Sequence, residues 1–149
     1  MPRFSFIVPG EPQGKARART WYDPRVGKVV SKTPENTVVY ENLVKLCYQS
    51  ASKGYRFPDD TPLDIAIEAR FSIPKSVSKK KRALMLAGEI LPTKAPDSDN
   101  IAKSVLDGIQ GVCFKNDNSV VSLAVRKTYS EVPCVMVWVR EAVGENSPK

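Results

Sequence analysis

Residues 96–109, PDSDNIAKSVLDGI, join an apolar helical stripe to a group of charged side chains. The apolar residues recur at the spacing of a helix with one buried face, and they are Ile101, Ala102, Val105, Leu106 and Ile109. We predict that this helix ends near Gln110–Gly111. Because Asp97 and Asp99 stand directly before the stripe, the helix should begin at a pair of carboxylates.

The rest of the chain carries both strand and helix patterns. Short runs with strand character predict strands at Phe4–Val8, from Leu63 to near Ile73–Pro74, at Val120–Tyr129 and at Val135–Val139. Apolar residues at helical spacing predict helices from Thr33 to about Ser52 and from Ser78 to Gly88. The expected fold is a small single domain of the α/β (α+β) class, with a mixed β-sheet of about four to five strands packed with about three helices. The domain should span residues 1–143, followed by a flexible C-terminal tail at 144–149.

The charge of the chain favours an anionic partner. It has 149 residues, a net charge of +7 and an isoelectric point near 9.4. Nucleic acid is the leading candidate. The longest apolar stretches are too short to cross a bilayer and no secretory segment follows Met1, so we expect no membrane partner.

Histidine is absent and the cysteines are three, without CxxC spacing. The absence of histidine excludes Ser-His-Asp and Cys-His catalysis, HNH-type nuclease chemistry and histidine-ligated zinc. The number and spacing of the cysteines argue against a disulfide framework and a zinc ribbon, and favour a reducing cytoplasm. Carboxylates, lysine and a hard metal ion remain as means of hydrolysis.

Asp97 and Asp99 are predicted to share a divalent cation. If residues 97–99 are extended, both side chains project to the same side of the backbone. Alternatively, Ser98 or Asp99 caps the helix, and the two roles are compatible. Asp117, in Lys115-Asn116-Asp117-Asn118, is a third candidate, although a lone aspartate in a polar loop is more often a turn residue.

Lys103 lies one helical turn beyond Asp99. It has two readings. Its ammonium can form i,i+4 ion pairs with Asp99 and Asp107, or it can point into the carboxylate group and neutralise a phosphate.

Two basic segments are candidates for contact with DNA. The first contains Lys15, Arg17 and Arg19 and continues into Trp21 and Tyr22, a mixture suited to an arm or loose hairpin that contacts phosphates and stacks on bases. The second is the run Lys79, Lys80, Lys81 and Arg82 at the start of a predicted helix. In both cases the alternative is an ordinary solvated surface.

Pro96 to Gly108, followed by Asn116 to Val121, resembles the RusA family of Holliday-junction resolvases, whose pattern runs PDxDNxxKxxxDAL and then DDxxV. The opening FSFIVPGEPQGKARAR, the helix start at 33–41, the lysine-rich run and Lys127–Tyr129 are also similar to the family. By position, Asp97, Asp99 and Asp117 resemble its metal-binding catalytic aspartates, and Lys103 resembles its essential lysine. Asn116 stands where the family commonly has the first of two aspartates.

The resemblance implies a homodimer that binds a four-way DNA junction and nicks two strands symmetrically with Mg²⁺, or Mn²⁺ as a substitute, in recombination and repair. Such a protein would be cytoplasmic and nucleoid-associated, and encoded by a bacterium, a phage or a prophage. Two alternatives stay open. One is a metal-dependent nuclease that prefers flaps or forks, and the other is a non-catalytic basic nucleic-acid-binding protein.

Overall fold

The computed structural model describes residues 2–16, 19–32 and 34–144. Arg17, one of the predicted DNA contacts, and residues 145–149 of the predicted tail lie outside these ranges. The described chain forms a small α+β domain with three α-helices and six strands, which confirms the predicted fold class. None of its helices is long and apolar enough to cross a membrane.

The main sheet has four strands in the order β1-β6-β4-β5, with β1 at Arg3–Pro9, β4 at Leu63–Ser72, β5 at Val120–Ser130 and β6 at Cys134–Glu141. β6 runs antiparallel to both β1 and β4, whereas β4 and β5 are parallel, so the sheet is mixed as predicted. All four predicted strands are present, and each strand end lies within two residues of its predicted position.

β4 shows why these residues form a sheet with one buried face. Every second side chain of the strand is buried, at Leu63, Ile65, Ile67, Ala69 and Phe71. This alternation follows from the period of two along a strand. The buried side chains belong to the core that also contains the apolar stripe of residues 101–109.

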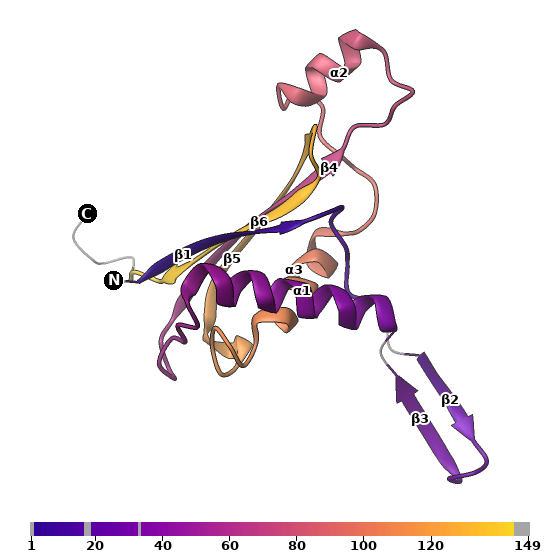
Figure 1. Cartoon of the computed structure of the whole chain (residues 1–149), viewed down its shortest axis with the longest axis vertical. Helices are drawn as coiled ribbons and strands as arrows, with labels where there is room; N and C mark the ends of the chain where they lie inside the picture. Colours follow the sequence, from indigo (N-terminus) through magenta and orange to yellow (C-terminus); the bar gives the residue numbers. More distant parts are fainter. Residues whose placement is uncertain (1, 17–18, 33, 145–149) are drawn as a thin grey trace.

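Two helices, α1 (Glu35–Ser52) and α3 (Ser98–Ile109), pack against each other beside the sheet (Figure 1). Gly108 permits their close approach. A Cβ atom at this position would lie 2.8 Å from Val44 Cβ and 3.0 Å from the Glu41 carbonyl oxygen. α3 ends at Ile109, one residue before the predicted end, and Gln110 is its C-cap. α1 begins at Glu35 with Pro34 in the N-cap position.

The basic segment predicted as an arm or loose hairpin is a two-stranded ribbon of β2 (Arg19–Asp23) and β3 (Lys28–Lys32). The Asp23 carbonyl oxygen accepts hydrogen bonds from the N–H groups of Val26 and Gly27, which closes the turn. Figure 1 shows the ribbon projecting beyond the N-terminal end of α1, away from the main sheet.

The helix α2 (Lys79–Leu86) lies at the opposite end of the molecule from the ribbon (Figure 1). Ser78 caps it, because its hydroxyl oxygen accepts a hydrogen bond from the Lys81 N–H at 3.2 Å. The connection from β4 to its parallel neighbour β5 contains α2, α3 and the short 3₁₀ helix η1 (Asp117–Ser119). This single crossover therefore carries the predicted catalytic residues and the lysine-rich run.

Candidate active site

The start of α3 differs from the extended geometry predicted for residues 97–99. Asp97 is extended, with φ −69° and ψ 153°, but Ser98 and Asp99 belong to the first helical turn. The Ile101 N–H donates to the Asp97 carbonyl oxygen at 3.0 Å, and this bond draws the two residues into the helix. Side chains two positions apart do not face each other on a helix, so the expected shared face is not formed.

The capping prediction was also wrong in its residue. Asp97, rather than Ser98 or Asp99, occupies the N-cap position, and its side chain makes no capping hydrogen bond. Asp97 and Asp99 are exposed, and neither forms an ion pair with any residue in the described ranges. Two uncompensated carboxylates thus lie at the positive end of a helix dipole, where negative charge is favoured.

Asp117 is the half-buried first residue of η1, beyond the other end of α3. The loop before it stays at that end, because the Cys113 N–H donates to the Ile109 carbonyl oxygen at 2.9 Å. Within residues 2–16, 19–32 and 34–144, no three or more acidic, cysteine or histidine side chains are grouped so that they could hold a metal ion. The metal role of Asp97, Asp99 and Asp117 stays a prediction.

Asn116 has a local structural role where the family motif commonly has an aspartate. It is the N-cap of η1, and its side-chain oxygen accepts a hydrogen bond from the Asn118 N–H at 3.0 Å. Because a carboxylate and an amide oxygen can both cap in this way, Asn116 retains the turn without the negative charge.

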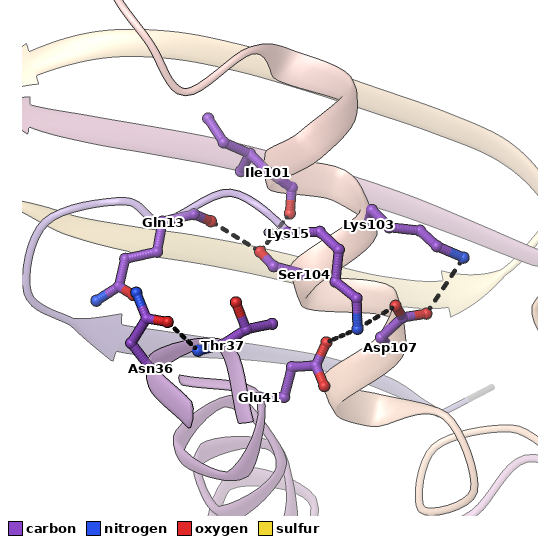
Figure 2. Close-up of polar contacts among 9 residues, drawn as sticks. All are labelled: Gln13, Lys15, Asn36, Thr37, Glu41, Ile101, Lys103, Ser104 and Asp107. Atoms are coloured by element: carbon purple, nitrogen blue, oxygen red, sulfur yellow. Dashed lines mark hydrogen bonds and ion pairs between the residues drawn. The ribbon is translucent and has the colours of Figure 1, made fainter. Parts of the chain in front are cut away.

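Lys15, Glu41, Lys103 and Asp107 form an ion cluster where α1 meets the second half of α3 (Figure 2). Lys15 Nζ lies 2.7 Å from Glu41 Oε2 and 3.2 Å from Asp107 Oδ2, while Lys103 Nζ lies 3.4 Å from Asp107 Oδ1. Burial lowers the pKa of Lys15, but hydrogen bonds and attraction from Glu41 and Asp107 outweigh it, so the pKa is raised above its ordinary value.

This ion cluster changes the interpretation of two predicted residues. Lys15, expected to contact DNA, has a half-buried side chain, and its ion pairs with Glu41 and Asp107 join α1 to α3. A contact between Lys15 and DNA stays a prediction. Lys103 pairs with Asp107 in the i,i+4 arrangement, and not with Asp99, among the residues described. Its side chain is nevertheless 53% exposed.

The segment Gln13–Lys15 is fastened to the first half of α3. The Lys15 N–H donates to the Asn100 carbonyl oxygen at 3.0 Å, and Ser104 Oγ lies within hydrogen-bonding distance of the Gln13 carbonyl oxygen, at 2.9 Å (Figure 2). A Cβ at Gly14 would lie 2.9 Å from the Pro96 Cβ and 3.0 Å from that of Asn100. The chain that leads to the ribbon therefore runs in close contact with the residues around Asp97.

Two further cations, Lys94 and Lys127, were not proposed as DNA contacts from the sequence. Lys94 Nζ and Lys127 Nζ lie 5.6 Å and 5.2 Å from the centroid of the Phe71 ring, and Lys127 donates a hydrogen bond to the Lys94 carbonyl oxygen. No acidic partner is present for either lysine within the described ranges. In the register of β4 and β5, Lys127 stands opposite the buried Ala69, which directs it to the helix-bearing side of the sheet. No local sequence pattern indicates this, because burial does not alternate along β5.

The remaining predicted DNA contacts are accessible. Lys79, Lys80 and Lys81 are exposed in the first turn of α2, and Arg19 is exposed at the start of β2. Arg82 is half-buried, and its guanidinium lies 3.6 Å from the carboxylate of Glu131.

Comparison with known proteins covers nearly the whole chain. Residues 9–140 match the family model described as Endodeoxyribonuclease RusA. The Bacillus subtilis (strain 168) protein named "Uncharacterized protein YqaN" is 34% identical over 143 residues, which are 95% of this chain and 98% of the relative. These matches confirm the resemblance that the motif at 96–121 indicated, and the chain belongs to the RusA family of endodeoxyribonucleases.

Proposed function

We propose that this protein is a metal-dependent endodeoxyribonuclease that resolves Holliday junctions by paired nicks, with Asp97 and Asp99 at its active centre. One observation carries the proposal. Asp107 and Glu41 are neutralised by lysines, whereas Asp97 and Asp99 lie exposed at the start of α3 with no cationic partner in the described chain. Carboxylates left without a protein cation are suited to an external one.

The donor atoms fit a hard divalent cation. Mg²⁺ prefers oxygen ligands, and it is commonly held by one or two carboxylates together with waters and substrate phosphate, so Asp97 and Asp99 provide a sufficient protein contribution. A bound Mg²⁺, or Mn²⁺ in its place, supplies an activated water and offsets charge on the phosphate. Asp117 enters the proposal through the family motif alone.

Lys103 is proposed to neutralise a phosphate oxygen beside Asp99. Its exposed ammonium has one partner within the described ranges, Asp107 Oδ1 at 3.4 Å, and an i,i+4 pair of this kind is worth only a few tenths of a kcal/mol. Its side chain is therefore free to exchange that partner for a substrate phosphate.

DNA affinity is proposed to come from α2 and from the lysines near Phe71. Lys79, Lys80 and Lys81 occupy the N-terminal turn of α2, which has no acidic residue, so their charges add to the positive end of the helix dipole. A DNA phosphate would relieve the repulsion among these lysines and the helix dipole. Lys94 and Lys127 extend the basic surface toward Asp97, because Lys94 precedes Asp97 by three residues.

The active form is proposed to be a homodimer of a single domain at residues 1–143, acting in the cytoplasm, where chromosomal, phage or prophage DNA is found. Two-fold symmetry would present two active centres to the two strands that are cut. The free edge of β5 supports this assembly. Val121 and Leu123 are 63% and 44% exposed there, and the strand has a hydrogen-bonded neighbour, β4, on one side.

The decisive test is Asp97→Asn, assayed on a synthetic four-way junction with Mg²⁺. We expect nicking to be lost while binding to the junction, measured without divalent metal, is unchanged. Unchanged nicking would dismiss the active centre and favour a non-catalytic DNA-binding protein. Asp117→Asn is tested in parallel, because a turn residue would leave nicking intact and a metal ligand would not.

Substrate choice needs a separate comparison. Flaps, forks and plain duplex are offered to the wild-type protein under the same conditions as the junction. Preferential nicking of the junction in two strands of like polarity supports resolution, and faster cleavage of flaps or forks would replace it with a different structure-selective nuclease.

The dimer is tested with Leu123→Lys, which places a charge on the free edge of β5. Sedimentation should show a monomer for this variant. Val29→Lys is the control, because Val29 is also apolar and is 67% exposed but lies on the ribbon. A Leu123→Lys variant that stays dimeric would remove β5 as the interface.

A further inference from the structure

The β2–β3 ribbon sorts its side chains by chemistry onto two faces. Residues directly opposite each other across a ribbon share a face, and neighbours along a strand take opposite faces. The cross-strand pairs on one face are Arg19–Lys32, Trp21–Val30 and Asp23–Lys28, and those on the other are Thr20–Ser31 and Tyr22–Val29. One face therefore combines cations with an indole, and the other carries no charge.

The cationic face contains an unfavourable pair. Arg19 and Lys32 stand directly opposite each other, and like charges in that relation destabilise a ribbon. Neither side chain has an acidic ion-pair partner among the residues that the structure describes. A bound anion between the two cations would remove the repulsion.

A groove of about 630 Å³ lies at the foot of the ribbon, lined by Arg19, Trp21 and Lys32 from this face, by Thr20 from the other, and by Pro34 and Glu35. Its volume falls in the range of small-ligand sites. The Trp21 side chain remains 45% exposed, and the extensive contacts of β2 and β3 are with each other. An aromatic surface is thus held open beside two cations.

We propose that this groove binds an unpaired nucleotide of the DNA substrate, with the base stacked on Trp21 and the phosphate held by Arg19 and Lys32. An aromatic side chain next to basic residues is the arrangement with which proteins bind single-stranded DNA, because every base has a face that can stack. The Glu35 carboxylate can accept an N–H from the edge of such a base. The identification of DNA as the ligand rests on the proposed function.

The position of the ribbon relates this contact to the proposed active centre. The backbone of Lys15 is hydrogen-bonded to Asn100, close to Asp97, and the ribbon begins four residues later at Arg19. A nucleotide unpaired at a branch point and bound in the groove would therefore orient the branch with respect to the proposed active centre. Continuous duplex, whose bases are stacked, offers no such nucleotide.

The first test uses the fluorescence of Trp21. The chain has two tryptophans, so Trp138→Phe leaves Trp21 as the single indole. Titration of this variant with fluorescein-labelled oligo(dT), without divalent metal, should quench Trp21 emission in parallel with the rise in oligonucleotide anisotropy, and both should weaken as salt increases. Binding seen by anisotropy with no change in Trp21 emission would overturn the proposal.

The second test compares the two faces of the ribbon. Trp21→Ala should weaken oligo(dT) and junction binding about tenfold, the size expected for loss of one stacked base. Tyr22→Ala, on the opposite face, should bind within about twofold of the wild type. An equal loss in both variants would refute the assignment to the Trp21 face.

The result is separable from that of the proposed function. Quenching of Trp21 should persist when Asp97→Asn is added, because no metal is present. If the Asp97→Asn variant still nicks DNA, the proposed active centre is refuted, and the proposal for the groove is unaffected. If nicking depends on Asp97 but oligo(dT) does not change Trp21 emission, only the proposal for the groove is refuted.

Discussion

The carboxylates at the two ends of α3 differ in their exposure and in their ion pairing. Near its C-terminal end, Asp107 is held between Lys15 and Lys103, and Gly108 is pressed against α1. At its N-terminal end, Asp97 and Asp99 are exposed and have no cationic partner in the described ranges. The comparison separates acidic residues that join elements of the fold from acidic residues that remain available for chemistry.

The largest expected difference comes from removing one carboxylate at each end. Asp99→Asn should lower the rate of junction nicking about 1,000-fold, because one of the two carboxylates proposed to hold the divalent cation is lost. Its unfolding free energy should fall by no more than about 1 kcal/mol, the size of a helix-dipole contribution. Asp107→Asn should instead destabilise by about 1–2 kcal/mol, since Lys15 and Lys103 lose a partner.

Single-turnover nicking and urea unfolding measure these two quantities. If Asp99→Asn unfolded the protein and its folded fraction nicked at the normal rate, the proposed difference between the two ends of α3 would be contradicted.

Packing at the joined end is tested with Gly108→Val. The new side chain would overlap Val44 and the Glu41 backbone, so we expect a loss of about 3 kcal/mol in unfolding free energy, seen as a lower Tm. Ser98→Val makes a β-branched substitution at the exposed end and should cost only a few tenths of a kcal/mol. Equal Tm values for the two variants would show that α1 and α3 are not closely packed at Gly108.

Lys15 and Lys103 both contact Asp107, which allows a sharper comparison. Lys15→Met leaves two part-buried carboxylates without their shared cation and should destabilise by about 1–2 kcal/mol. Lys103→Met removes an exposed i,i+4 pair and should cost less than about 0.5 kcal/mol. Urea unfolding at neutral pH gives both values, and a reversed order would contradict the structural role of Lys15.

The smallest expected effect is the response of the Lys15 contacts to alkaline pH. Because the pKa of Lys15 is raised above its ordinary value of 10.5, its stabilising contribution is present at neutral pH and is lost as pH rises through the higher folded pKa. The difference in unfolding free energy between wild type and Lys15→Met should stay constant from about pH 7 to 9 and shrink above 10.5. A difference that grew with pH would mean that the pKa is lowered.

Periodic patterns predicted most of the fold. The alternation in residues 63–71 and the helical stripe in 101–109 depend on local sequence, and both elements formed as expected. For the ribbon at 19–32, composition indicated an arm or loose hairpin but left an ordinary loop as the alternative. The family assignment was also accessible, because the motif at 96–121 fixes several charged residues in register.

Details of the candidate site required the structure. Whether residue 98 belongs to the helix decides where Asp97 and Asp99 point, and helix boundaries are uncertain by a residue or two in a sequence. The ion cluster joins three distant segments through Lys15, Glu41 and Asp107, and no local pattern reveals such pairing. For the same reason, the ion pairs of Lys15 were not predicted, and Lys127 was not proposed as a DNA contact.

The crossover between the parallel strands β4 and β5 has a consequence for the newly synthesised chain as it folds. It carries Lys79–Arg82, Asp97, Asp99, Lys103 and Asp117, so these groups reach their final positions only after strands far apart in the chain have paired. Such long-range pairing is slow to form. If the proposed active centre needs these groups in place, a ribosome-bound or partly folded chain would not nick DNA before β4 and β5 have paired.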